Sequence, residues 1–251
     1  MSAIAISGIA FVLICASTIL AMMLRSALPE HHLGSDSKEV IRLATAMIAT
    51  LAAIVLGMLI SSTRSSYEQA SGYVDRLTAG IVELDVRLDE YGPEARPLRK
   101  LVRDTLGPLA DSIWRGNAGP SDRAVPFQFA ARGEVVLRGV QELSPQSAVQ
   151  SSLHSRALQI GADLAQTRLL IFSQRGSSLS TAFLSVLVLW VMVIFGSFGI
   201  FTRPNTTVVV VLLVCALSVS SAIFLILEMG QPFEGLLQIS SGPLRNALAP
   251  L

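Results

Sequence analysis

The chain has 251 residues, of which 51% are apolar and 15% are charged, and its mean hydropathy is +0.59. This composition is too apolar for a soluble globular protein of this size, and it indicates an integral membrane protein. The formal net charge is +1, and no basic stripe gathers on a polar segment, which argues against a nucleic-acid partner.

A first apolar run covers residues 3–24, and no lysine or arginine precedes it. It lacks the basic segment that opens a cleaved signal peptide, so we expect a retained membrane span. A polar connection follows at residues 25–38 and contains the pair His31-His32. Neighbouring side chains seldom aim at one ion, and no further His or Cys lies near them. We therefore expect this pair in solvent and predict neither a metal site nor a cofactor.

A second apolar run covers residues 41–60, about the ~20 residues that a helix needs to cross ~30 Å of hydrocarbon. At ~100° per residue its small side chains gather on about one third of the helix circumference, with an arginine at each end. This small face consists of Ala46, Ala49, Thr50, Ala53 and Gly57, and its flanking arginines are Arg42 and Arg64.

Beyond Arg64 the pattern changes to apolar residues spaced alternately by three and four, with charged residues between them. This spacing is typical of a coiled-coil seam in water. Gly92-Pro93 then ends the helix. Residues 38–91 are thus expected to form one unbroken helix that begins as a membrane span. The seam consists of Tyr67, Ala70, Val74, Leu77, Ile81, Leu84, Leu88 and Tyr91.

The polar stretch that follows, up to about residue 178, carries several helix patterns. One amphipathic segment spans residues 98–113 and is expected to bend or end near Gly107-Pro108. Residues 117–126 are rich in Gly, Pro, Ser and Asp and predict a loop, and a short helix is expected at residues 127–143.

A long helix is expected next, because Ser144-Pro145 provides an N-cap followed by proline at the first helical position. Its apolar residues recur at three-four spacing up to residue 175, and we expect it to run directly into a third span at residues 179–201. This helix and the one at residues 64–91 carry matching apolar stripes and are expected to pack antiparallel. The spacing alone also allows both stripes to meet neighbouring subunits.

A turn at Arg203 separates the third span from a fourth span at residues 207–227. An even number of spans places both termini and the polar domain on one side of the membrane, and the Lys and Arg bias favours the cytoplasm. The fold class is therefore an all-α membrane protein of four spans with a helical cytosolic domain between spans 2 and 3. The expected parts are spans 1 and 2 in residues 1–60, the helical domain in 61–178, spans 3 and 4 in 179–228, and a C-terminal tail in 229–251.

Two segments resemble bestrophins. Residues 57–70 resemble the point where the second bestrophin span leaves the membrane, and residues 227–235 resemble the Glu-x-x-x-Pro-Phe motif after the fourth span. Together with its layout of spans, the chain resembles the bacterial bestrophin-like family of four-span membrane proteins, which is distantly similar to bestrophin anion channels. The residues that carry this resemblance are Ser66, Tyr67, Glu228, Pro232 and Phe233.

The resemblance implies a homo-oligomer of the bacterial inner membrane, a pentamer in the family, that conducts anions such as chloride through a neck lined by the second span. The neck would fall on the small face, where bestrophins carry bulky apolar side chains, so a wider constriction or closer helices are expected. Several bestrophins hold calcium through acidic residues around the Pro-Phe motif. Gly230 and Gln231 replace two of these positions and leave Glu228 and Glu234. Because calcium takes ~6 to 8 oxygen ligands, we predict no calcium site.

The leading hypothesis for function is an oligomeric, anion-selective ion channel. Arg42 and Arg64 lie about 33 Å apart at ~1.5 Å per residue, so a symmetric oligomer would carry basic rings at both mouths of a pore. The small face also fits close helix packing, with the arginines reaching lipid headgroups. Glu228 either pairs with Arg64 or Arg175 or is an interfacial carboxylate in contact with water.

The alternative function is a non-conducting membrane scaffold or sensor whose cytosolic coiled coil binds a partner. It predicts that the seam faces outward and that the small face is buried within one subunit. An enzyme is not expected, because Arg76 and Arg87 intersperse the acidic residues of the seam helix and no convergent acid, base and nucleophile are visible. These acidic residues are Glu83, Asp85, Asp89 and Glu90.

Overall fold

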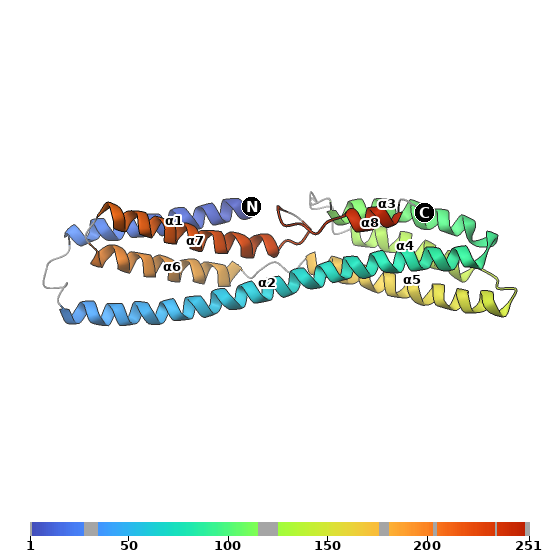
Figure 1. Cartoon of the computed structure of the whole chain (residues 1–251), viewed down its shortest axis with the longest axis horizontal. Helices are drawn as coiled ribbons and strands as arrows, with labels where there is room; N and C mark the ends of the chain where they lie inside the picture. The colour runs from blue at the N-terminus through green and yellow to red at the C-terminus, as the bar shows by residue number, and fades with distance from the viewer. Residues whose placement is uncertain are drawn as a thin grey trace. The chain divides into compact units, whose positions relative to one another are not determined.

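The computed structural model describes residues 2–27, 35–114, 125–175, 181–202, 205–233 and 235–248. These residues contain helices and no strand, which confirms the predicted all-α class (Figure 1). The elements are α1 (Ala3–Ala27), α2 (Ser35–Tyr91), the 3₁₀ turn η2 (Pro93–Ala95), α3 (Arg96–Trp114), α4 (Val125–Gln141), α5 (Ala148–Arg175), α6 (Thr181–Phe201), α7 (Thr206–Met229) and α8 (Gly242–Leu248).

Four of the described helices are long and apolar enough to cross a membrane: α1, the first part of α2, α6 and α7. They agree with the four predicted spans. The helix α2 continues for 57 residues from its span into the seam without interruption and ends at Tyr91. Gly92 follows with a φ of 120°, a conformation that glycine adopts at little cost, so the predicted end of this helix is correct.

The chain divides into two compact units, and α2 contributes to both. We call Met1–Ser65 with Ser178–Gly230 the membrane unit, and Ser66–Ser177 with Gln231–Leu251 the helical unit. In the membrane unit, α1 packs against both α6 and α7. Two apolar clusters hold these helices together, one around Ile14 and Phe195 and one around Ala10 and Ile223.

Hydrogen bonds and close backbone approach add to the contacts of α1. The Ser17 hydroxyl donates to the carbonyl oxygen of Met192 on α6 at 2.7 Å, and the Ser220 hydroxyl on α7 donates to the carbonyl oxygen of Ser7 at 2.8 Å. A Cβ at Gly199 would lie 2.6 Å from the carbonyl oxygen of Thr18, so glycine permits the close approach of α6. Small and hydroxylated residues of this kind are typical of helix contacts within membranes.

In the helical unit, the seam of α2 packs antiparallel against α5. The amide nitrogen of the Gln150 side chain donates to the carbonyl oxygen of Tyr91, 3.1 Å away, near the start of α5. Further along, Arg156 Nη2 lies 2.8 Å from Glu83 Oε1. A Cβ at Gly80 would lie 2.8 Å from Leu164 Cδ2, so the two helices approach closely there. The antiparallel packing predicted from the two stripes is confirmed.

The seam is therefore buried inside one chain rather than left for a neighbour. Its buried members divide between two hydrophobic clusters, which α5 and the other helices of this unit complete. A fully buried apolar side chain contributes about 1.5–3 kcal/mol relative to the exposed state, so the seam is a main source of stability for this unit. The buried seam residues are Ala70, Val74, Leu77, Ile81, Leu84, Leu88 and Tyr91.

Two predicted helix boundaries differ from the structure. The helix α3 continues through Gly107-Pro108 to Trp114, so the expected end near this pair is wrong, while the alternative of a bend stays a prediction. The helix α5 begins at Ala148, and its cap is Ser147 rather than Ser144. The Ser147 hydroxyl oxygen accepts a hydrogen bond from the backbone nitrogen of Gln150 at 3.1 Å, which is the first half of a capping box.

Some predictions fall on parts of the chain that the structure does not describe. These are the pair His31-His32, most of the loop at residues 117–126, the turn at Arg203, and the direct passage of α5 into the third span across residues 176–180. The short helix expected at residues 127–143 is present as α4. The helix α8 was not predicted, and it packs against α3 within the helical unit.

Candidate functional site

The span of α2 presents three distinct faces. Four members of the small face, Ala46, Thr50, Ala53 and Gly57, are exposed in the single chain, and Ala49 is half-buried. The face that packs within the chain lies about 100° around the helix from the small face at ~100° per residue. Its most buried residues are Thr45, Ala52 and Thr63.

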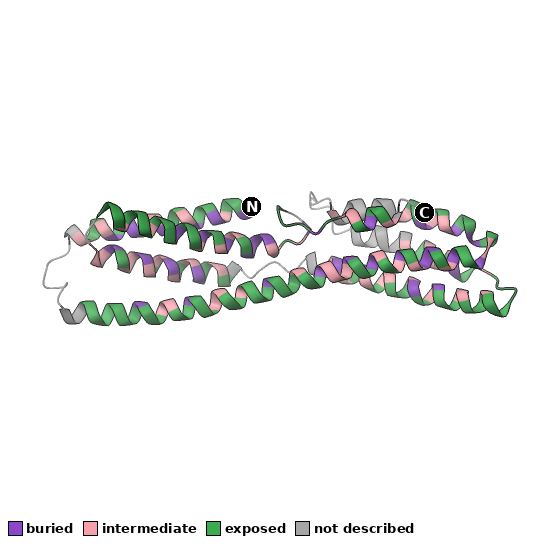
Figure 2. Ribbon diagram, in the orientation of Figure 1, coloured by how far each residue is buried: buried purple, intermediate pink, exposed green. Residues whose placement is uncertain are grey.

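The third face of the α2 span carries bulky apolar side chains, and these are exposed as well. Most of this span has the colour of exposed residues in Figure 2. In the apolar segment of α2 that could span the membrane, only 11% of the residues are buried, whereas 22% to 28% are buried in the other three spans. Much of this span is therefore open to lipid or to another copy of the chain. The bulky exposed residues on this face are Leu43, Met47, Leu51, Ile54 and Met58.

These exposures bear on the two structural expectations of the scaffold alternative. That alternative expected an outward-facing seam, whereas the seam is buried against α5. It also expected the small face to be buried within one subunit, whereas four of its five residues are exposed. Both expectations are wrong for this chain.

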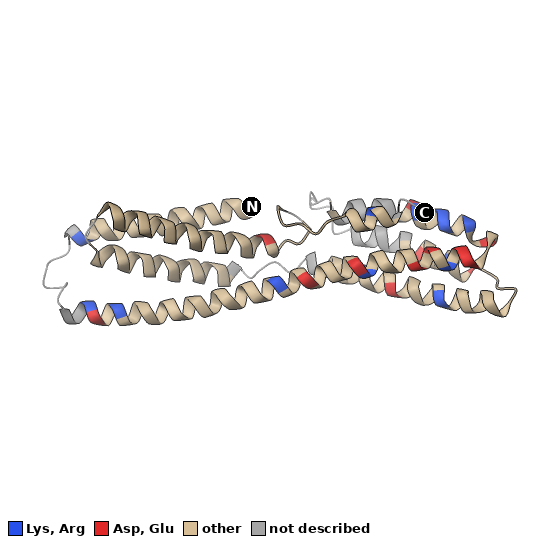
Figure 3. Ribbon diagram, viewed as in Figure 1, with Lys and Arg blue, Asp and Glu red and all other residues tan. Residues whose placement is uncertain are grey.

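Arg42 and Arg64 are exposed on α2, at the two ends of the small face. Figure 3 shows a long uncharged stretch of α2 with basic residues at either end. Between the two arginines, Ile60 lies on the same face, but it is not among the small residues by which that face was predicted. It lies at the same angle as Arg42 at ~100° per residue, and its side chain is 40% exposed. The helical period alone is sufficient to find it, but a search for small residues passes over it.

The two segments that resemble bestrophins meet in one cluster of the helical unit. Phe233 is buried there, and Tyr67 packs against the same cluster from the beginning of the seam. Ser66, next to Tyr67, is exposed. The carbonyl oxygen of Pro232 accepts a hydrogen bond from the backbone nitrogen of Ile239 at 2.8 Å, which closes the loop after the motif. The Pro-Phe motif thus anchors the C-terminal segment to the core of this unit.

Glu228 lies in the last turn of α7 and is only 4% exposed. The expectation of a carboxylate in contact with water is wrong, because the final turn of α7 is buried through Ile226 and Leu227 as well. The structure describes neither Glu234 nor the side chain of Arg175. Among the described residues, no three His, Cys, Asp or Glu side chains form a group that could hold a metal ion.

The acidic residues of the seam helix are engaged in ion pairs. Arg99 holds Asp85 through two hydrogen bonds, from Nε to Oδ1 at 2.6 Å and from Nη2 to Oδ2 at 2.7 Å, and it also contacts Asp89. The hydrogen bond to Asp85 raises the pKa of Arg99 above its usual value. Glu83 pairs with Arg156 on α5, and Glu90 pairs with Arg87 on α2 itself. The first three carboxylates therefore connect α2 to α3 and α5, and Glu90 stays on the surface of α2. They form a structural network rather than an acid-base site.

Comparison with known proteins adds the following findings. The sequence matches the Bestrophin-like domain over residues 11–244. Two crystal structures of a bacterial bestrophin homologue from Klebsiella pneumoniae, each with a single substitution, have similar folds. One has a TM-score of 0.72 at 13% identity and covers 99% of this chain and 96% of that chain. The other has a TM-score of 0.67 at 13% identity and covers 96% of each chain.

No curated protein sequence matches this chain. The likeness to the Klebsiella structures shows the fold, and the family match extends over nearly the whole sequence. Together with four apolar helices of spanning length, these findings identify an integral membrane protein. The chain belongs to the bestrophin-like family.

Proposed function

We propose that this chain assembles into a symmetric homo-oligomeric ion channel, selective for anions such as chloride, whose conduction path is lined by the small face of α2. The observation that carries the proposal is the exposure of this face. Ala46, Thr50, Ala53 and Gly57 are exposed, while α2 packs within its own chain through a different side. A surface of small residues lets symmetry-related helices approach a common axis and still leave a narrow path.

The charges at the ends of this face support anion selectivity. Arg42 and Arg64 are about 33 Å apart at ~1.5 Å per residue, close to the ~30 Å thickness of the hydrocarbon core. In a symmetric oligomer each arginine becomes a ring at one mouth of the pore. Rings of positive charge concentrate anions, and the apolar lining between them is able to gate by dewetting.

Ile60 provides the bulky side chain that the small face otherwise lacks. It lies one turn before Arg64 and is partly exposed in the single chain. In an oligomer arranged around the small face, its side chain would form the narrowest apolar ring. This ring would lie on the face of α2 to which the family resemblance assigns the neck.

The helical unit supports this arrangement because its seam is satisfied within the chain, whereas most of the apolar span of α2 is exposed. Five copies is the number that the family resemblance implies. The family resemblance implies the bacterial inner membrane, and the bias of Lys and Arg favours an orientation with both termini and the helical unit in the cytoplasm.

The test is anion flux into liposomes that contain the purified protein. We expect flux with the wild type and its loss in Ala53→Trp, because an indole on the small face would fill the axis. Met58→Trp is the matched control, since Met58 is exposed on the bulky face of the same helix. Absence of wild-type flux across pH, calcium and voltage would contradict the proposal and favour the scaffold.

A further inference from the structure

A small cavity lies in the core of the helical unit, between α2, α3, α4 and α5. Its volume is about 60 Å³. One water molecule needs about 10–15 Å³ of such a volume, so the cavity has room for a few waters or for one small ion. Most of its wall consists of apolar side chains from all four helices, among them Leu77, Val102, Val140 and Leu164.

One charged side chain lines this cavity among the described residues, that of Arg168 on α5. Arg168 is only 9% exposed. Its guanidinium group reaches Gly133 on α4, where a Cβ would overlap Nη1 of Arg168 and lie 3.2 Å from Cζ. The absence of a side chain at position 133 therefore makes room for the guanidinium. The helical unit thus holds a buried positive charge at the wall of its cavity.

The surroundings of Arg168 disfavour this charge. Burial lowers the pKa of Arg168 below its usual value, whereas the hydrogen bond to Asp85 raises the pKa of Arg99 in the same unit. Among the described residues of the wall, Thr105 is the other polar side chain, and its hydroxyl donates to the carbonyl oxygen of Leu101 at 2.7 Å. The wall of the cavity therefore supplies little negative charge to offset the guanidinium.

The size and the charge of the cavity together select a class of ligand. A buried charge is stabilised by a counter-charge that also accepts its hydrogen bonds, and a guanidinium has five N–H donors. A cation would be repelled by Arg168. A divalent anion would keep one charge uncompensated in an apolar space, which is costly. A small monovalent anion has the charge and the size that fit.

We propose that a small monovalent anion, such as chloride or bromide, binds in this cavity against the guanidinium of Arg168. The anion would lie between four helices and stabilise their packing, so the stability of the helical unit would depend on the concentration of the anion. The site uses the helical unit alone, and it does not depend on conduction along the small face of α2.

Thermal unfolding of the full-length protein in detergent tests the site, with sodium bromide compared with sodium gluconate at equal ionic strength. Bromide that binds the folded state should raise the Tm by about 3–5 °C for each tenfold increase in concentration above its Kd. Arg168→Met removes the charge and should lose this response. Ala165→Leu fills the cavity while keeping Arg168, and it should lose the response as well. Either variant tests the site if the other fails to fold.

Arg156→Gln is the matched control, because Arg156 lies on the same helix with a half-exposed side chain, and this variant should keep the wild-type response. Equal Tm values of the wild type in bromide and in gluconate would overturn the proposal. So would a wild-type response in both Arg168→Met and Ala165→Leu, because bromide would then bind elsewhere. Where both variants fold, loss of the response in only one of them would overturn the joint assignment of the cavity and the guanidinium.

Discussion

The indole nitrogen of Trp114 donates a hydrogen bond to the carbonyl oxygen of Ile239 at 2.6 Å, which joins the last residue of α3 to the segment after α7. The Trp114 ring also meets Phe233 edge to face, with ring centroids 6.1 Å apart and an interplanar angle of 89°. Such aromatic pairs contribute about 0.5–1.5 kcal/mol beyond the area that they bury. The Pro-Phe motif is thus a mechanical anchor in this protein.

The first prediction concerns this anchor. Trp114→Phe removes the hydrogen bond to Ile239 and keeps an aromatic ring, so the C-terminal segment should lose about 1–2 kcal/mol of local stability. Hydrogen exchange of residues 236–244 measures this as loss of protection. Trp190→Phe, in α6, should leave the exchange of that segment unchanged. Unaltered protection in Trp114→Phe would contradict the anchor.

The second prediction concerns Tyr91, the last residue of α2. Its side chain is buried, and its hydroxyl has no hydrogen-bond partner among the described residues. Burial raises the pKa of Tyr91 above its usual value, and the nearby charge of Glu94 adds to the effect. Above pH ~10 the unfolded chain gives up this proton while the folded chain keeps it, so stability falls as pH rises.

We therefore expect the Tm of the wild type to decline above pH ~10 and Tyr91→Phe to lose that part of the decline. At neutral pH the substitution should be neutral or slightly stabilising, because it removes an unsatisfied buried hydroxyl. Thermal unfolding in detergent between pH 7 and pH ~11 is the measurement. Tyr73→Phe, at a half-buried seam-helix position, is the control. An equal alkaline decline in wild type and Tyr91→Phe would show that another group is responsible.

The third prediction concerns the pair of Asp85 and Arg99. Asp85 is buried, and Arg99 holds both of its carboxylate oxygens. Asp85→Asn keeps the shape but removes the charge, and it should cost about 1–3 kcal/mol of unfolding free energy. Glu134→Gln breaks an exposed 3.5 Å pair with Arg138 and should cost less than about 0.5 kcal/mol. Denaturant titration measures the loss of unfolding free energy in both variants. Similar losses would contradict a larger contribution of the buried pair of Asp85 and Arg99.

The fourth prediction concerns selectivity. Arg42→Gln removes one proposed basic ring, so the permeability of chloride relative to sodium should fall several-fold while conduction persists. The reversal potential across a salt gradient measures this ratio. Arg138→Gln removes a charge from an exposed site on α4 and should leave the ratio unchanged. An unchanged reversal potential in Arg42→Gln would remove this residue from the path.

The unbroken length of α2 was predictable because the apolar run of the span passes into the three-four spacing of the seam, and no helix-breaking residue pair occurs before Gly92-Pro93. The start of α5 was not predictable, because Ser144-Pro145 and Ser147 with Gln150 both fit the pattern of a helix cap. Only the folded chain shows that the Ser147 hydroxyl oxygen accepts the capping hydrogen bond. The helix α3 continues through Gly107-Pro108, although this pair disfavours a helix locally. The contacts of Trp114 join residues 125 positions apart and leave no local pattern.

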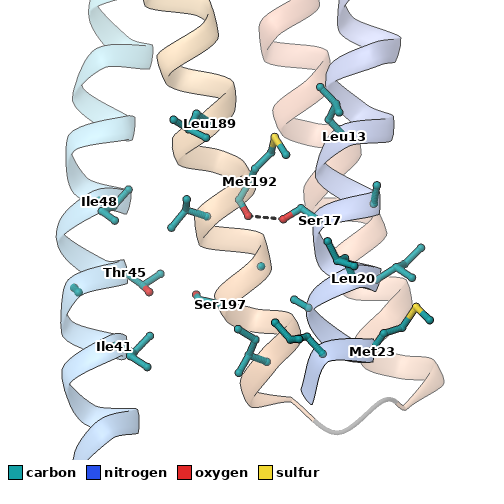
Figure 4. Close-up of a pocket in the computed structure, with 18 of the residues that line it drawn as sticks. Leu13, Ser17, Leu20, Met23, Ile41, Thr45, Ile48, Leu189, Met192 and Ser197 are labelled. Carbon is teal, nitrogen blue, oxygen red and sulfur yellow. Dashed lines mark hydrogen bonds between the residues drawn. The ribbon is translucent and has the colours of Figure 1, made fainter. Parts of the chain in front are cut away.

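The small face of α2 was visible from the helical period, but its exposure was not. All three faces of this span are apolar, so the sequence does not tell which one packs within the chain. The structure places Thr45 and Ala52 on that inner side. The apolar pocket between α1, the beginning of α2 and α6 was not visible in the sequence for a related reason, since its volume depends on the spacing of three helices rather than on any motif (Figure 4).

The central claim is that the small face of α2 lines a conduction path, and chemical block of single cysteines tests it most directly. Ala53→Cys on the small face and Ile54→Cys on the bulky face would each be placed in a chain whose Cys15 and Cys215 are replaced by alanine. A negatively charged thiol reagent should then stop anion flux through Ala53→Cys and leave Ile54→Cys conducting. Flux through fully modified Ala53→Cys, or equal block of both variants, would contradict the account.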